Sequence, residues 1–226
     1  MKIPLIHFLK NFLSVFLLLV LVFIIVSILN SFFITELNSF NIHSERPNPA
    51  QNYPNDLSYK IIAILVVPFV EEVFYRLGLK FSIRNTTFFI LGILYTLYLF
   101  FQPDDLNFND PIILLLFFGT IILGIVLIWF GVRKNAVFFE SLYAKHSKSI
   151  FWLSVIVFTY SHFILHQNHD SLYNIIFSPI ILFPYVIAGI LYGVIRIKFG
   201  FLWGCLAHML WNFLVVMQII DTLKWN

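Results

Sequence analysis

Long apolar stretches without a single charge alternate with short polar segments along this chain. None of these stretches alternates apolar and polar residues with the period of two that a barrel strand requires. Their lengths are close to the roughly 20 residues with which a helix crosses a bilayer. They are Asn11–Thr35, Thr86–Pro103, Pro111–Val132, Ser149–Gln167, Ser171–Ile195 and Phe199–Ile220. The pattern predicts an all-α fold, a polytopic bundle of transmembrane helices.

A seventh stretch, Ile61–Phe81, is apolar except for four charged residues. Its first half, Ile61–Val70, carries no charge, and the charges of the second half fall at helical spacing. These charges are Glu71, Glu72, Arg76 and Lys80. We therefore expect about seven spans.

The basic residues between the spans predict the orientation of the bundle. If the N-terminus is cytoplasmic, the cytoplasmic side receives Lys2, Lys10, Lys80, Arg84, Arg133, Lys134, Lys145, Lys148, Arg196 and Lys198, and the outer side only Arg46, Lys60 and Lys224. The acidic residues outside the spans sort the opposite way, with Glu140 as the exception. Cytoplasmic loops of membrane proteins are enriched in Lys and Arg, so we expect seven spans with the N-terminus inside and the C-terminus outside.

Two further segments complete the expected organisation. Residues 1–58 are expected to form an N-terminal anchor helix followed by an external loop, Asn38–Ser58, and residues 59–226 the core of the protein. The first apolar stretch has no small-residue cleavage site of a signal peptide, so it is interpreted as an anchor. Asn135–Ser147 is expected on the cytoplasmic side, as a short interfacial helix.

Composition narrows the class of protein. Of the 226 residues, 60% are hydrophobic and 11% charged, whereas a soluble domain carries about 25% charged residues. Both an ordinary soluble domain and a disordered chain are excluded. A net charge of +3 is too small for a nucleic-acid-binding protein, so no nucleic-acid partner is expected. The single Cys205 excludes a disulfide framework and a cysteine-based metal site.

Ionisable residues inside a span are costly, by roughly 2.5–3.5 kcal/mol each, and so are candidates for function. Glu72 and Arg76 are four residues apart with the acid first, the favourable order for an ion pair on one helix face. Glu71 lies about 100° around the helix from Glu72 and is left without a local counter-ion. An unpaired carboxylate in an apolar helix is a candidate proton acceptor; the alternative is that both acids pair with basic groups of neighbouring helices.

His208 and Asn212 form a second pair with a spacing of four in the last stretch. Gly200 and Gly204 continue the same face, and small residues at this spacing allow another helix to approach closely. A histidine and an amide side chain beside such a close helix contact are suited to a functional site. The alternative is that Asn212 is an interhelical hydrogen-bonding residue.

His162 and His166 are also four residues apart, a spacing that resembles a two-histidine metal face. The zinc-protease pattern requires Glu directly after the first histidine, and Phe163 occupies that position. His166 is therefore interpreted as the external end of its span, outside the site.

Three motifs taken together resemble one family. They read Glu71-Glu72-x-x-x-Arg76, Phe158-x-x-x-His162 and His208-x-x-x-Asn212, in this order and each inside an expected span. The chain in this respect resembles the CPBP family, the type II CAAX prenyl endopeptidases and their bacterial relatives, also called ABI proteins. The resemblance covers roughly Ile61 to Val216. The chain departs from the family pattern at Leu77, where many members have Gly. In this chain the glycine is the next residue, Gly78.

The resemblance implies an intramembrane endopeptidase that cleaves a membrane-associated peptide or protein. The short loops and the composition rich in Phe, Ile and Asn favour a bacterial chain, so the expected location is a bacterial plasma membrane. It implies that Glu71 and His162 activate a water and that His208 and Asn212 stabilise the oxyanion. Glu72 and Arg76 would support these groups. Two histidines and a glutamate are also residue types that hold zinc, but a mechanism without metal or other cofactor is favoured.

Two alternatives of other classes stay open at this point. The first is a non-catalytic immunity or regulatory protein of the same family, which acts by binding partners. The second is a proton-coupled transporter, which commonly shows repeats and broken helices; the sequence has neither. For the protease we expect the catalytic residues to converge near mid-membrane, with Arg76 against Glu72 and His166 outside the cluster. These residues are Glu71, His162, His208 and Asn212.

Overall fold

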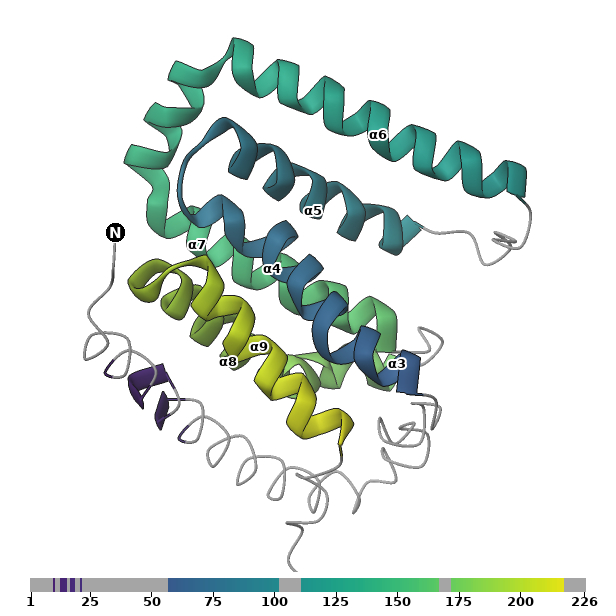
Figure 1. Cartoon of the computed structure of the whole chain (residues 1–226), viewed down its shortest axis with the longest axis vertical. Helices are drawn as coiled ribbons and strands as arrows, with labels where there is room; N and C mark the ends of the chain where they lie inside the picture. Colours follow the sequence, from purple (N-terminus) through teal and green to yellow (C-terminus); the bar gives the residue numbers. More distant parts are fainter. Residues whose placement is uncertain are drawn as a thin grey trace, which may run out of the picture. The chain divides into compact units, whose positions relative to one another are not determined.

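The computed structural model describes residues 10, 13–15, 17, 18, 21, 57–101, 111–166 and 172–217. Throughout these residues the regular elements are helices, as Figure 1 shows, so the predicted all-α class is confirmed. Most of the expected anchor helix and external loop lie outside the described residues. The segments between Phe101 and Pro111 and between His166 and Leu172 also lie outside them.

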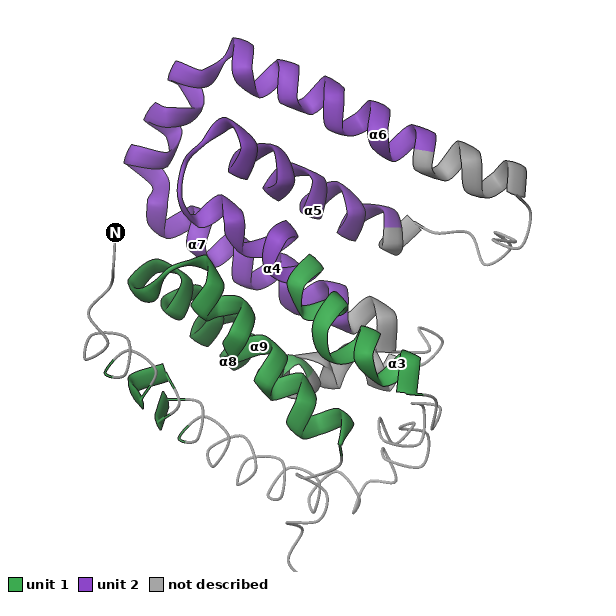
Figure 2. Cartoon of the chain, in the orientation of Figure 1, with its two compact units in different colours: residues 1–70, 170–226 green, residues 71–169 purple. Residues whose placement is uncertain are grey.

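The chain divides into two compact units, coloured separately in Figure 2. Unit 1 comprises residues 1–70 and 170–226, and unit 2 comprises residues 71–169. The division falls within helix α4, Val67–Arg76. Each unit is described by itself below.

Unit 2 begins with the second part of α4 and continues through a short 3-10 helix into three long helices. These elements are η2 (Leu77–Leu79), α5 (Ile83–Phe101), α6 (Pro111–Lys134) and α7 (Ala136–His166). Helix α5 packs against η2, α6 and α7. The three long helices coincide with three predicted spans, and α7 also contains the helix expected within Asn135–Ser147.

The close approach of α5 to α4 depends on a glycine. A Cβ atom at Gly92 would lie only 2.6 Å from the backbone oxygen of Phe74, so any larger residue forces the two helices apart. Gly78, the glycine displaced by one position from the family pattern, is buried, and a Cβ there would collide with the ring of Phe89.

A sharp bend separates α6 from α7. The axes of Gly119–Lys134 and Ala136–His162 differ by 81°. At the bend, the side-chain amide of Asn135 donates a hydrogen bond of 2.9 Å to the carbonyl oxygen of Gly131. Within α7, His146 has non-helical backbone angles (φ −122°, ψ 28°). The first turns of α7 therefore form a segment distinct from the expected span that follows.

The described elements of unit 1 are two early segments, the first residues of α4, and the last two helices of the chain. They are α3 (Leu57–Ile61), the π-helical η1 (Ile62–Val66), α8 (Leu172–Phe199) and α9 (Phe201–Val216). Helix α9 packs against α8 and η1. Gly200 joins α8 to α9 with φ 107°, a conformation that favours glycine. Helix α3 begins at Leu57, so it includes the last two residues of the segment predicted as an external loop, Asn38–Ser58.

The described helices differ in how clearly they qualify as membrane spans. Leu182–Phe199 of α8 is long and apolar enough to cross a membrane by itself. The bent pair of α6 and α7 adds a second span if it is counted as one, and Phe201–Val216 is apolar but shorter. The fold is thus all-helical in the described residues, and one or two of its helices are clear candidates for membrane spans.

Candidate active site

The buried ion pair of unit 2 lies on α4, as the spacing predicts. Arg76 Nη1 lies 3.1 Å from Glu72 Oε1, and both side chains are completely buried. The guanidinium group also lies over the ring of Phe158 on α7, with its carbon 4.0 Å from the ring centroid. The expected contact between Arg76 and Glu72 is therefore confirmed, and the cation has an aromatic face as an additional partner.

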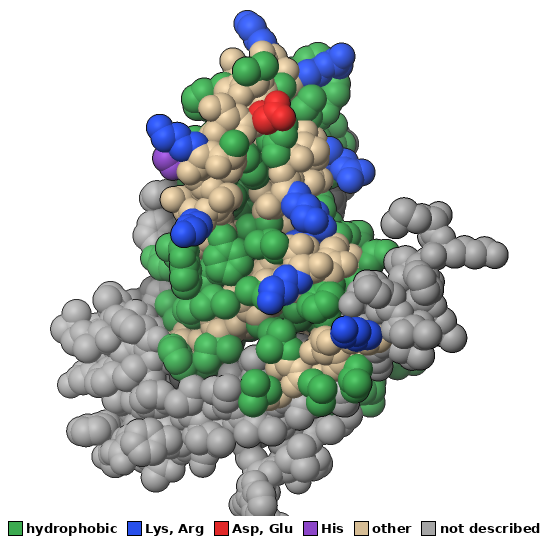
Figure 3. Space-filling view, turned by 90° about the vertical axis from the view of Figure 1, so that its left-hand side faces the viewer, with side chains coloured by type: hydrophobic (Ala, Val, Ile, Leu, Met, Phe, Trp, Pro, Cys, Tyr) green, Lys and Arg blue, Asp and Glu red, His purple; other side chains and the backbone are tan. Residues whose placement is uncertain are grey.

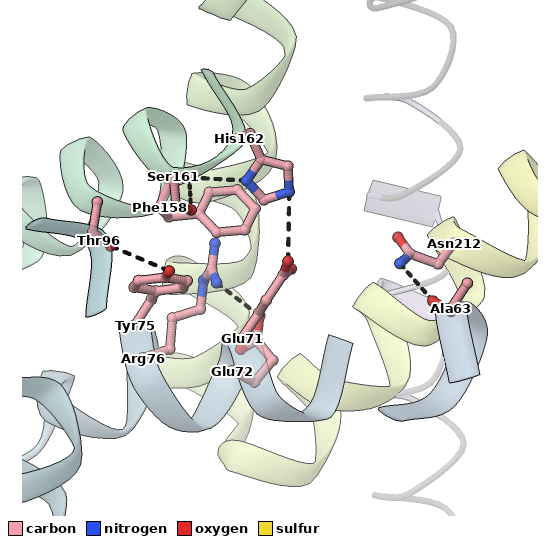
Figure 4. A network of polar contacts seen from close by, with 10 residues as sticks. All are labelled: Ala63, Glu71, Glu72, Tyr75, Arg76, Thr96, Phe158, Ser161, His162 and Asn212. Carbon is pink, nitrogen blue, oxygen red and sulfur yellow. Dashed lines mark hydrogen bonds and ion pairs between the residues drawn. The ribbon is translucent and has the colours of Figure 1, made fainter. Parts of the chain in front are cut away.

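The neighbouring carboxylate faces a histidine of α7. Glu71 Oε1 lies 3.7 Å from Nε2 of His162, and the two side chains are 16% and 13% exposed. Figure 4 shows the two groups directed toward one another from α4 and α7. Two of the predicted site residues, separated by a long stretch of sequence, are thus brought together within unit 2.

The orientation of the His162 ring is set by its own helix. Nδ1 lies 2.9 Å from the carbonyl oxygen of Phe158, one turn earlier. A carbonyl oxygen only accepts hydrogen bonds, so Nδ1 carries the hydrogen. Nε2 is consequently the ring nitrogen that faces Glu71. The Phe158 ring packs against the His162 ring with centroids 4.4 Å apart, which restricts the imidazole further.

A set of contacts around Tyr75 connects α4 with α5 and α7. The Tyr75 hydroxyl lies 3.3 Å from the hydroxyl oxygen of Thr96 on α5, and Ser154 of α7 donates a hydrogen bond to the Tyr75 carbonyl. The ring of Tyr75 meets that of Phe158 edge to face, with centroids 5.9 Å apart. These contacts fix α4 against α5 and α7 and so the separation of Glu71 from His162.

Sequence reasoning missed these supporting residues. Tyr75, Thr96 and Ser154 are buried polar residues within apolar stretches, and each taken alone is compatible with ordinary packing. A usable signal is the place of Tyr75, one turn after Glu71. The sequence does not reveal that Thr96 and Ser154 meet it.

The second predicted pair belongs to unit 1. His208 is 3% exposed, and its ring stacks on that of Tyr192 in α8, with centroids 4.4 Å apart and an interplanar angle of 20°. Asn212 donates a hydrogen bond of 3.0 Å from Nδ2 to the carbonyl oxygen of Ala63 in η1. Asn212 thus connects α9 to η1, the interhelical role that the sequence left open. Because His208 and Asn212 lie in unit 1, their convergence with Glu71 and His162 stays a prediction.

His166 lies at the end of α7, and its side chain is outside the described residues. Among the residues that the structure describes, no three His, Cys, Asp or Glu side chains gather as a metal-binding group.

What the arrangement offers chemically is a carboxylate and an imidazole nitrogen facing each other in a largely buried site. Comparisons with protein-family models, with curated proteins and with solved structures found no match for this chain.

Proposed function

We propose that this chain is an intramembrane endopeptidase of the CPBP type that hydrolyses a peptide bond of a membrane-associated peptide or protein. The observation that carries the proposal is the juxtaposition of Glu71 with Nε2 of His162, whose other nitrogen is held by the Phe158 carbonyl. Amide hydrolysis requires a base for the attacking water. A carboxylate and an imidazole nitrogen that face one another supply two acceptors for it.

The spacing of the two groups suits a water between them. A separation of 3.7 Å between Oε1 and Nε2 is longer than the roughly 2.7–3.2 Å of a direct hydrogen bond. A water that donates one hydrogen to Glu71 and the other to His162 leaves its oxygen lone pairs free for attack. Glu72 contacts Arg76, whereas Glu71 faces His162, so Glu71 is the carboxylate that we propose as the base.

In the proposed reaction Glu71 acts first as a base and then as an acid. As the water oxygen forms a bond to the scissile carbonyl carbon, Glu71 accepts its proton. The resulting oxyanion requires hydrogen-bond donors, and the resemblance assigns this task to His208 and Asn212. One amide hydrogen of Asn212 is used by Ala63, which leaves the second for the oxyanion. When the carbon–nitrogen bond breaks, Glu71 returns the proton to the leaving amine.

The distribution of polar and apolar side chains in unit 2 supports a membrane location. Its buried residues include Glu72, Arg76 and several Thr and Ser side chains, whereas α6 exposes Ile122, Leu127 and Phe130, each by more than half. Polar groups inside and large apolar groups outside are typical of helices surrounded by lipid. We propose a seven-span topology, N-terminus in the cytoplasm, in a bacterial plasma membrane.

The deciding experiment is a comparison of the membrane-derived peptides released by cells that carry the wild-type chain or Glu71→Gln. We expect a defined set of cleavage products that disappears with Glu71→Gln, because the amide cannot accept the proton. The matched control is Glu140→Gln, the same substitution at an exposed glutamate of α7. Identical products from wild type and Glu71→Gln would refute the protease and favour the non-catalytic, partner-binding alternative.

Two further measurements test the remaining parts of the proposal. Inhibition by a metal chelator that added zinc reverses would replace the metal-free mechanism by a zinc mechanism. Labelling of single-cysteine variants tests the topology: Arg133 is expected on the cytoplasmic side and Asp104 on the outer side. If both residues label from the same side, the span between them is absent and the count of seven fails.

A further inference from the structure

One end of unit 2 carries an unusual concentration of positive charge. Its six exposed basic residues are Lys80, Arg84, Arg133, Lys134, Lys145 and Lys148, and its exposed acid among the described residues is Glu140. Figure 3 shows a face of the molecule on which Lys and Arg side chains are interspersed with apolar ones. The basic residues have no role in the proposed chemistry. We call them the basic end of unit 2.

Two turns of the chain gather these residues. The turn between η2 and α5 is fixed by Asn85, whose side chain donates a hydrogen bond of 2.9 Å to the Lys80 carbonyl. Phe81 of this turn packs against Tyr143 of α7, with ring centroids 5.4 Å apart. The bend between α6 and α7 lies on the same side of unit 2 (Figure 1). The charges of three helices, α5, α6 and α7, and of the turn after η2 thus lie at one end of unit 2.

Apolar side chains are exposed among these charges. Val137 and Phe138, in the first turn of α7, are 81% and 63% exposed. They lie three to five residues after Arg133 and Lys134. Arg133 lies over the ring of Trp129, 5.0 Å from its centroid. Cations, an aromatic ring and protruding apolar groups on a helix that bends away from the preceding span are the composition of a segment that lies in a membrane interface.

We propose that the basic end of unit 2 binds the phosphate groups of anionic phospholipids, with Val137 and Phe138 inserted among the acyl chains. The proposal rests on the membrane location given above and not on the protease chemistry. The cations match the charge of the phosphates. The adjoining apolar side chains favour a lipid over an acidic protein, because a lipid offers a charged head and an apolar tail side by side.

The test uses the purified full-length chain in a neutral detergent, titrated with dioctanoyl phosphatidylglycerol or dioctanoyl phosphatidylcholine. Binding to the folded state raises the melting temperature, so the midpoint of the titration gives the apparent affinity. We expect phosphatidylglycerol to bind more tightly than phosphatidylcholine. This difference in affinity should decrease at high salt, because the charges are screened. A basic residue near a membrane surface contributes about fivefold in affinity.

The variant Arg133→Gln/Lys134→Gln/Lys145→Gln/Lys148→Gln is therefore expected to weaken phosphatidylglycerol binding by at least about tenfold. All four side chains are exposed, so the fold should be retained. The matched control changes the same positions but keeps the charge: Arg133→Lys/Lys134→Arg/Lys145→Arg/Lys148→Arg should bind as the wild type does. Val137→Ser/Phe138→Ser should weaken the binding of both lipids.

Three results would overturn the proposal: equal affinity for the two lipids, wild-type affinity in the charge-neutralised variant, or reproduction of the effect by inorganic phosphate alone. The last result would indicate a site for a free anion. The cleavage comparison and the lipid titration of the wild-type chain together separate the two proposals. Preferential binding of phosphatidylglycerol by a wild-type chain whose products do not depend on Glu71 refutes the proposed function alone. An active protease without lipid preference refutes this inference alone.

Discussion

Helices α4 and α9 each carry a pair of polar residues four positions apart, yet the two pairs have different partners. Glu72 and Arg76 contact each other, completely buried on one face of α4. His208 and Asn212 turn instead to other elements of unit 1, His208 to the ring of Tyr192 and Asn212 to the carbonyl of Ala63. A spacing of four predicts a shared face. It does not predict that the two residues will be partners.

The chemistry of the side chains accounts for the difference. An ionised side chain removed from water requires an opposite charge nearby, and Arg76 is that charge for Glu72. An imidazole ring and an amide lose less on burial and can be satisfied by an aromatic ring or a backbone carbonyl. The charged pair is therefore fixed locally by α4, whereas the neutral pair serves to join helices.

The largest expected effect comes from breaking the charged pair. Glu72→Gln leaves Arg76 buried without its carboxylate partner and should lower the free energy of unfolding by about 3–5 kcal/mol. Glu71→Gln should cost much less, because Glu71 is partly exposed and 3.7 Å from its histidine. Melting temperatures and yields of the two variants in detergent test the difference. If Glu72→Gln is as stable as Glu71→Gln, the ion pair is not what stabilises α4.

The next largest effect concerns the two histidines. In His208→Phe the ring that stacks on Tyr192 is retained, so the protein should fold. Loss of the proposed oxyanion donor should lower the cleavage rate by roughly 10²–10³. His162→Phe removes both the hydrogen bond to Phe158 and the nitrogen that faces Glu71, and should lower the rate by a similar or larger factor. Rates are measured on a peptide identified by its loss in Glu71→Gln. Full activity in His208→Phe would make His208 a packing residue only.

The two pairs also show how far the sequence alone leads. The apolar stretches predict the helices of the described chain, and the pairing of Glu72 with Arg76 follows from their spacing. The approach of Glu71 to His162 depends on packing between α4 and α7, which no local pattern encodes. The same holds for the choice of Ala63 as the partner of Asn212. Contacts within one helix are predictable from spacing, and contacts between helices are not.

A smaller effect is expected from the glycine that lets α5 approach α4. Gly92→Ala places a Cβ atom 2.6 Å from the Phe74 oxygen. The backbone of α4 then has to move, at a cost of about 1–3 kcal/mol and with a disturbed charged pair. Gly119→Ala on α6 is the matched control, since a Cβ there meets nothing within 4 Å; it should be neutral or slightly stabilising. Equal melting temperatures for the two variants would contradict the close packing of α4 and α5.

The smallest effect isolates the neutral pair by comparing two asparagines with the same bond. Asn212 and Asn135 each donate a hydrogen bond from Nδ2 to a backbone carbonyl oxygen, with lengths of 3.0 Å and 2.9 Å. The bond of Asn212 is partly buried and joins two helices. The bond of Asn135 is exposed and lies within one turn. Asn212→Leu should therefore lower the free energy of unfolding by roughly 0.6–1.7 kcal/mol, and Asn135→Leu by less, since water replaces its bond. Unfolding of both variants by detergent titration measures the difference. If Asn212→Leu loses more cleavage activity than its lower stability explains, the second amide hydrogen of Asn212 serves the oxyanion. Unchanged cleavage would mean that Asn212 only joins α9 and η1.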